Sequence, residues 1–303
     1  MKNKYFNLIF LLLIFFLDLD IKGQSITIKE SNQSDGAFFY KLNAGKIISK
    51  AKFMLKKPQY ILYWGTDGSN VYGTDGNNIY SLDFTTKKTR VIYTSKEWIN
   101  NFFVRNNHIY FTMTLTPNID ENEGRYTMKK HKITVLDCMK KVVLKQIVVP
   151  FNCNIIGLSI SPNEQKIVFV NTLNIDSPKK TSYELVGFDI TERKKVKYDK
   201  AYYSKNQWFV EGHTYNSLSW KDNDNFYYLK KMGKEQNKGV YLYNLKQNIS
   251  TKIFVELPQR DINWFIWDNN SILYSNRKNI ISFDGKKEKI IYTHSLSVTE
   301  GVK

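Results

Sequence analysis

The sequence predicts an all-β protein built as a six-bladed β-propeller, and three observations support this. One hairpin pattern occurs six times along the chain. Its copies lie 40 to 55 residues apart, close to the period of a four-stranded propeller blade. Short apolar runs joined by Asn, Gly and Asp turns stand between the copies. Five or seven blades stay open as alternatives.

The repeated hairpin is an alternating apolar run that ends at Asp or Asn and continues into a polar, often basic turn. In its clearest copy, residues 183–197, Leu185 and Phe188 lead to Asp189, and the chain then turns toward Val196. Alternation with a turn residue at its end is typical of a β-hairpin. We assign each run to the third strand of a blade. The other copies lie at residues 39–43, 79–83, 133–137, 240–244 and 280–284.

Two further strands are expected before each third strand. Residues 155–170 contain the clearest pair, with residues 161–164 as the turn between two apolar runs. Asn and Gly in such turns tolerate the positive φ that tight hairpins require. The same arrangement predicts strand pairs at residues 61–64 and 71–72, 102–104 and 109–111, and 264–267 and 272–274.

The pair at residues 155–170 resembles the WD40-like repeat of the TolB-type propeller family. That repeat consists of an apolar strand, Ser-Pro-Asp-Gly, Lys and a second apolar strand. Ser161, Pro162 and Lys166 match it, as do Ile167 and Phe169 in the second strand, whereas Asn163 and Glu164 replace the Asp-Gly pair. A partial match at residues 218–229 has Trp220 where the family often has an aromatic residue. The resemblance implies the fold and no particular activity.

The first hairpin, at residues 39–43, lacks a full set of preceding strands. Residues 25–29 can supply one of them. The tail at residues 295–298 can supply another by closing the ring from the far end, as propellers commonly do to protect their edges.

The N-terminus predicts export. Lys2 and Lys4 precede ten apolar residues, 8–17, which is about half of what a helix needs to cross a bilayer. A basic start, a short apolar run and a small residue at Gly23 are typical of a secretory signal, so we expect a signal peptide at residues 1–23 and one propeller domain at 24–303. An uncleaved membrane anchor is the alternative. The expected location is secreted or periplasmic, with no membrane span after removal of the signal.

The chain is strongly basic, with a net charge of +17 that becomes +16 once residues 1–23 are removed. Such a charge attracts anionic polymers or acidic surfaces, although solvated surface lysines are the simpler interpretation. Export argues against nucleic acid as a partner. Cys138 and Cys153 are expected at opposite ends of one blade, too far apart for a disulfide, so both should be free thiols.

No catalytic residue set, cofactor motif or metal motif is evident. The four histidines show no paired ligand spacing. Residues 157–161 begin like a nucleophile elbow but lack its final Gly and lie in a predicted strand. The acidic turn at residues 222–225 starts like a calcium loop yet lacks the later Gly and acidic ligand.

Candidate binding residues come from loop length. The connections between second and third strands, and between blades, should share one face, and the longest of them cover residues 112–125, 171–182, 198–215 and 230–238. Long loops on a rigid scaffold concentrate binding residues. The segment 198–215 is the richest in aromatic residues, and packing at a blade junction or a small extra hairpin is its alternative role. Its candidate ligand-binding residues are Tyr202, Tyr203, Trp208, Glu211 and His213.

These patterns favour a binding module that recognises a protein or glycan of the cell envelope or exterior through the long-loop face. One alternative is an extracytoplasmic enzyme acting on a carbohydrate or lactone, with His213 and Glu211 as acid and base. The other is a protein that binds an anionic polymer through basic turns at the rim.

Overall fold

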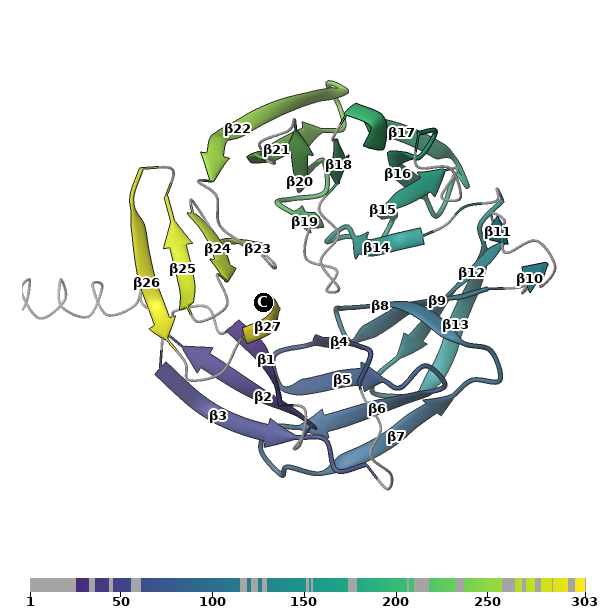
Figure 1. Cartoon of the computed structure of the whole chain (residues 1–303). Coiled ribbons are helices and arrows are strands. Elements are labelled where there is room, and N and C mark those ends of the chain that lie inside the picture. Colours follow the sequence, from purple (N-terminus) through teal and green to yellow (C-terminus); the bar gives the residue numbers. More distant parts are fainter. Residues whose placement is uncertain are drawn as a thin grey trace, which may run out of the picture.

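The computed structural model shows a ring of six antiparallel sheets, and thus confirms the predicted six-bladed β-propeller (Figure 1). The structure describes residues 26–32, 36–43, 46–55, 61–114, 119–120, 125–126, 130–150, 153, 155–173, 179–205, 207–209, 218–232, 237–257, 265–268, 271–275, 279–284, 286–293 and 298–302. The predicted signal peptide lies outside these residues and stays a prediction.

The blades follow one another in chain order, with each innermost strand toward the ring centre and each outermost strand at the periphery (Figure 1). Blade 1 comprises β27 (Val298–Val302), β1 (Ile26–Asn32), β2 (Gly36–Asn43) and β3 (Lys46–Lys52). Blade 2 comprises β4 (Tyr63–Thr66), β5 (Asn70–Thr74), β6 (Asn78–Asp83) and β7 (Thr89–Thr94). Blade 3 comprises β8 (Ile99–Arg105), β9 (His108–Thr114), β12 (His131–Asp137) and β13 (Val142–Val148).

Blade 4 comprises β14 (Ile155–Ile160), β15 (Lys166–Leu173), β16 (Ser182–Asp189) and β17 (Lys195–Tyr202). In blade 5, both β18 (Trp208–Phe209) and β19 (Leu218–Trp220) pair with β20 (Asn225–Met232), which is followed by β21 (Asn237–Asn244) and β22 (Ile249–Leu257). Blade 6 comprises β23 (Phe265–Asp268), β24 (Ser271–Ser275), β25 (Asn279–Phe283) and β26 (Glu288–Thr293). A separate hairpin, β10 (Ile119–Asp120) with β11 (Arg125–Tyr126), lies between β9 and β12.

The ring closes by pairing the two ends of the described chain. β27 lies antiparallel to β1, with Thr27 opposite Val302 and Ile28 opposite Gly301. The expected closure is therefore confirmed, with Val298–Val302 as the closing strand, whereas residues 295–297 of the predicted strand lie outside the described residues. Blade 1 thus draws its innermost strand from the far end of the sequence.

In blades 2 to 6, the Asp or Asn that ends the third strand caps the turn that follows. The Asp137 carboxylate accepts hydrogen bonds from the backbone N–H of Met139 and Lys140, at 2.9 and 2.8 Å, and Lys141 closes the turn with φ at 59°. A side chain that accepts from the backbone two residues on replaces a backbone turn, which explains why this position is so uniform. These backbone hydrogen bonds, chiefly the one from Lys140, lower the pKa of the Asp137 carboxyl group below its ordinary value. Equivalent caps form at Asp83, Asp189, Asn244 and Asp284.

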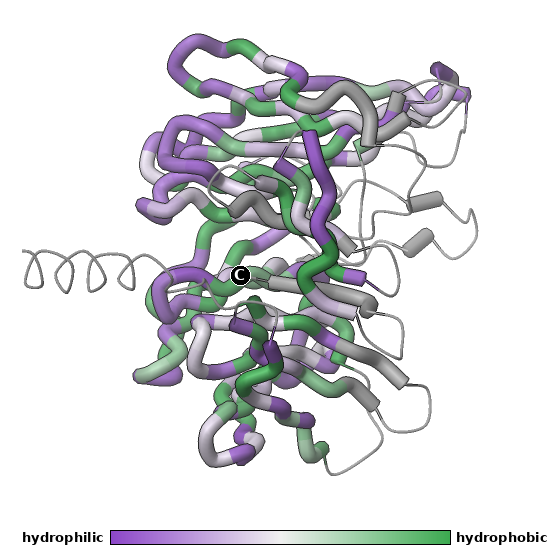
Figure 2. Tube along the Cα trace, turned by 90° about the vertical axis from the view of Figure 1, so that its left-hand side faces the viewer, coloured by the Kyte–Doolittle hydropathy of each residue, from purple (hydrophilic) through white to green (hydrophobic). Residues whose placement is uncertain are grey.

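The core fills the spaces between neighbouring blades. Phe39 of blade 1 meets Trp64 of blade 2 edge-to-face, with ring centroids 5.1 Å apart. Cys138 and Cys153 are buried free thiols in two different clusters, in agreement with the expectation from their strand positions. In the edge-on view of Figure 2, hydrophobic segments run through the blades and hydrophilic segments gather at turns. Within the described residues, no helix is long and apolar enough to cross a membrane.

Candidate binding face

The connections of the propeller fall on two faces. One face carries the short turns between first and second strands and between third and fourth strands. The other carries the connections between second and third strands and between blades, and we name it the long-loop face. The described part of this face includes the ends of β7, β15, β17 and β20. Residues 198–205, the first described part of segment 198–215, reach this face at the end of blade 4.

The structure places the two candidate tyrosines at the surface of this face. Residues 198–202 still belong to β17, so the predicted loop begins five residues later than expected. The short 3-10 helix η1 (Tyr203–Lys205) follows. Tyr202 is 37% exposed and Tyr203 is 49% exposed, which makes them accessible to a ligand.

A polar cluster beneath the tyrosines fixes β17 to blade 5. Lys230 of β20 donates to both carboxylate oxygens of Asp199 in β17, at 2.8 and 2.9 Å, and to the backbone carbonyl of Lys200 at 2.9 Å. The Tyr228 hydroxyl donates to Asp199 at 2.8 Å. Burial, and then the Asp199 charge, raise the pKa of Tyr228, so the phenol stays protonated and keeps donating. Lys230 is only 8% exposed, and a buried charge needs such partners.

The next residues pack at the junction with blade 5, which is one of the alternative roles expected for this segment, and they add a short strand to that blade. β18 pairs with β20, with Trp208 opposite Lys231 and Phe209 opposite Lys230. Phe209 is 1% exposed, and its ring lies 5.8 Å from that of Tyr228. Part of the aromatic segment therefore builds the blade junction. The Trp208 side chain and the whole of Glu211 and His213 lie outside the described residues, so their role in binding or catalysis stays a prediction.

Trp98 is an exposed aromatic residue on the long-loop face that loop length and composition did not single out. It follows β7 and is 51% exposed. Its ring covers Gly76, where a Cβ would lie 2.4 Å from the indole, and φ at Gly76 is 104°. Gly76 thus lets the indole pack flat on a tight turn. The signal in the sequence was the repeated Gly-Thr-Asp-Gly turn at residues 73–76, which by itself indicates only a hairpin connection.

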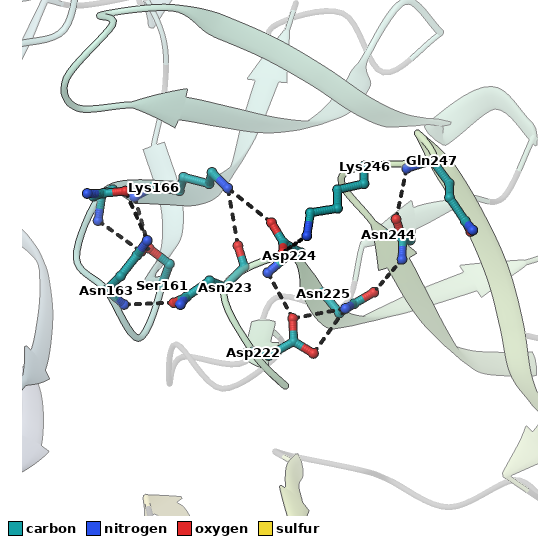
Figure 3. Close-up of polar contacts among 11 residues, drawn as sticks. Ser161, Asn163, Lys166, Asp222, Asn223, Asp224, Asn225, Asn244, Lys246 and Gln247 are labelled. Carbon is teal, nitrogen blue, oxygen red and sulfur yellow. Dashed lines mark hydrogen bonds and ion pairs between the residues drawn. The ribbon is translucent and has the colours of Figure 1, made fainter.

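The acidic turn at residues 222–225 is occupied by protein contacts (Figure 3). Both oxygens of Asp222 accept from the Asn225 amide, at 2.9 and 3.0 Å. Asp224 lies 2.8 Å from Lys246 and 3.6 Å from Lys166. The hydrogen bond from Lys246, and the charge of Lys166, lower the pKa of Asp224. Lysines thus hold the carboxylate that a cation would need, and the described residues contain no group of three or more His, Cys, Asp or Glu suited to a metal.

The serine of the elbow-like sequence has a structural role. Ser159 lies within β14 and is 1% exposed. Ser161 follows that strand, and its hydroxyl donates to Asn163 and accepts from the backbone N–H of Lys166, at 2.7 and 2.9 Å. Neither serine stands at a strand-to-helix turn, so this motif is ordinary β-structure.

Glu164 joins blade 4 to blade 3 through a polar cluster that the sequence pattern did not reveal. It accepts hydrogen bonds from Asn106 at 2.8 Å, from His108 at 2.6 Å and from the buried hydroxyl of Tyr110. Burial raises the pKa of Glu164, but the hydrogen bonds from these three residues outweigh it and leave the pKa below its ordinary value. Glu164 stands where the TolB-type repeat has Gly, and its φ is 59°. The replacement of that Gly by Glu164 thus adds hydrogen bonds between blades 3 and 4.

The outer strands form a basic rim, which we define as β3, β7, β13, β17, β22 and β26 with the turns that precede them. The rim carries 19 Lys or Arg and five Asp or Glu, so it holds a net charge of +14 within a chain of +17. Its basic residues are Lys46, Lys50, Lys52, Lys87, Lys88, Arg90, Lys140, Lys141, Lys145, Arg193, Lys194, Lys195, Lys197, Lys200, Lys246, Lys252, Lys286, Lys287 and Lys289.

The fold and the surfaces described above define the class of this protein as a six-bladed β-propeller with a basic rim and exposed aromatic residues on one face. No protein-family model matches the chain, and no curated protein matches it. Solved structures do match, and their likeness at these low identities shows the fold alone.

Three of these structures are similar over most of the chain. An oligogalacturonate lyase in complex with manganese has 10% identity and a TM-score of 0.57, with 86% of this chain and 71% of that chain covered. A nidogen/laminin complex has 11% identity and a TM-score of 0.57, with 90% and 95% covered. TolB from Acinetobacter baumannii has 15% identity and a TM-score of 0.55, with 93% and 66% covered. The resemblance to TolB-type propellers is therefore confirmed at the level of the fold.

Proposed function

We propose that this chain is a secreted or periplasmic binding module that recognises a protein or a glycan through its long-loop face. The contact residues would be Tyr202 and Tyr203, with Trp208, Glu211 and His213 from the following segment. The export signal predicted at residues 1–23 supports the location. The propeller fold is compatible with binding, and one of its structural neighbours was solved as a nidogen/laminin complex.

The observation that carries this proposal is that two exposed tyrosine rings stand at the end of a strand held in place by hydrogen bonds. Tyr202 and Tyr203 lie shortly after Asp199, which Lys230 and Tyr228 hold in place. Aromatic side chains offer a large contact area, and tyrosine is enriched at binding hot spots. Because this strand is already held in place, less conformational entropy is lost when a ligand binds.

The test uses the mature chain, residues 24–303, as bait in a pull-down from cell-envelope extract and on a glycan array. We expect a specific partner whose binding falls at least tenfold in the Tyr202→Ala/Tyr203→Ala double variant, because aromatic hot spots are worth about 2 kcal/mol or more. The matched control is Met139→Ala, which truncates a 70% exposed side chain on the opposite face. No retained partner, or equal binding by all variants, would refute the proposal for this surface.

A second candidate function is the binding of an anionic polymer along the basic rim, and the charge distribution favours it. The rim holds 14 of the 17 net positive charges. Within the described part of the chain, a few of its lysines meet a carboxylate, as Lys197 does with Glu184 at 2.8 Å. Affinity for dextran sulfate should fall steeply between about 50 and 200 mM salt through counterion release, at roughly one unit of logarithmic slope for each ammonium in contact. A flat salt response would dismiss this function.

A further inference from the structure

Two lysines flank the exposed ring of Tyr202. The Lys200 ammonium lies 4.8 Å from the ring centroid, and the Lys205 ammonium lies 5.1 Å from it. Lys200 comes from β17 and Lys205 from η1, so a strand and a helical turn converge on one ring. Two positive charges therefore lie within about 10 Å of each other at the surface, because each is within about 5 Å of the same point.

The nearby carboxylates do not neutralise these lysines. Asp199 accepts from Lys230, Tyr228 and the backbone N–H of Lys200, so its oxygens are directed into the blade junction. Glu184 pairs with Lys197 at 2.8 Å and lies 4.0 Å from Lys195. Among the residues that the structure describes, Lys200 and Lys205 make no ion pair and share only the Tyr202 ring. An ammonium held at an exposed ring is weakly bound and can be given up to a carboxylate.

The surroundings favour a sugar over a protein surface. Protein interfaces have an apolar core larger than two side chains, with aromatic and aliphatic residues packed together. β17 has no exposed large aliphatic side chain, whereas Val142, Val143 and Leu144 of β13 are 38% to 48% exposed. The patch at Tyr202 and Tyr203 is thus small, aromatic and cationic. Aromatic rings suit the apolar face of a sugar ring, and ammonium groups suit its carboxylate.

We infer that the ligand of the Tyr202 surface is an acidic glycan, whose sugar rings contact Tyr202 and Tyr203 and whose carboxylates pair with Lys200 and Lys205. This inference rests on the proposed function of the long-loop face and adds the chemical class of its ligand. The partly buried Asp199–Lys230 pair holds the surface in place, and its two charges cancel each other, so the outward positive charge is kept.

The experiment measures binding of the mature chain to alginate oligosaccharides, in which every sugar ring bears a carboxylate, and to neutral dextran oligosaccharides. The Lys200→Ala/Lys205→Ala variant is compared with Lys286→Ala/Lys287→Ala, which removes the same charge from a distant part of the rim. We expect alginate binding to weaken roughly tenfold in the first variant, since exposed ion pairs are each worth up to about 1 kcal/mol. The slope of logarithmic affinity against logarithmic salt should also decrease by about 2. The second variant should stay within about twofold of wild type.

The outcomes separate this inference from the function on which it rests. An equal loss in both lysine variants would overturn the inference, because attraction would then come from the whole rim. Absence of alginate binding would overturn it as well. If dextran or an envelope protein binds in a manner that depends on Tyr202 and Tyr203 but not on the lysines, the proposed function stands and the inference fails. Tighter binding of single-stranded oligothymidine than of alginate would also refute it.

Discussion

Replacement of Glu164 tests whether contacts between blades stabilise the ring. Glu164→Ala removes the acceptor for Asn106 and His108 and leaves the fully buried Tyr110 hydroxyl without a partner. An unsatisfied buried hydroxyl costs about 1–3 kcal/mol, and the loss of two further bonds to a charged acceptor adds to it. We therefore expect a loss of about 2–4 kcal/mol in the free energy of unfolding.

Glu164→Gly serves as the matched variant. It removes the same hydrogen bonds but also relieves the left-handed backbone at φ 59°, which costs an L-residue about 1–2 kcal/mol. Glycine loses more conformational entropy on folding, by roughly 0.5–1 kcal/mol, so the Gly variant should be more stable than the Ala variant by about 1 kcal/mol or less. Urea unfolding followed by tryptophan fluorescence measures both differences. If both variants lie within about 0.5 kcal/mol of wild type, the cluster does not stabilise the ring.

The same residue predicts a pH dependence. The folded pKa of Glu164 lies below its ordinary value, so its contribution to stability is present above the unfolded pKa of about 4.3 and is lost as pH falls through the folded pKa. The stability difference between wild type and Glu164→Gln should therefore be present at about pH 5 and shrink in more acidic solution. A difference that grows as the pH falls below about 5 would contradict the assigned direction.

Three further predictions concern packing, charge and thiol reactivity. Gly187→Ala should destabilise the protein by about 1–3 kcal/mol, because the added Cβ would lie 2.0 Å from the Tyr198 hydroxyl oxygen. Adding Tyr198→Ala should remove most of that clash, and thermal unfolding of the single and double variants tests this. Lys230→Met should cost about 3 kcal/mol, because the Asp199 charge loses the ammonium that pairs with it. The Lys230→Met/Asp199→Leu variant removes both charges and should recover much of the loss. Equal stability of the two variants in urea unfolding would refute the pairing. Burial raises the pKa of both Cys138 and Cys153 to about 12. The native protein should therefore react with a thiol reagent at about pH 8 only as fast as it unfolds. Rapid labelling without denaturant would contradict this, because it would show that the thiols are accessible.

The sequence predicted the fold because the propeller repeats a local signal. In blades 2 to 6 the Asp or Asn that ends the third strand caps its own turn within three residues, as Asp137 does, and this contact depends on no other part of the chain. Exposed Tyr202 and Tyr203 were likewise found from a long aromatic segment next to a strand. The Asp199–Lys230 pair could not be found in this way, because its partners are 31 residues apart and belong to different blades. Glu164 was visible only as a departure from the repeat, and its three partners lie more than 50 residues upstream.

The closing strand β27 makes the stability of blade 1 depend on residues 298–302. Its five residues are the innermost strand of blade 1, and they cover the backbone edge of β1 (Figure 1). Deletion of this short C-terminal piece would leave a three-stranded first blade with bare hydrogen-bonding groups facing the ring centre, and such an edge pairs readily with another molecule. Changes to residues 298–302 therefore act on blade 1, whose other three strands stand at the beginning of the described chain.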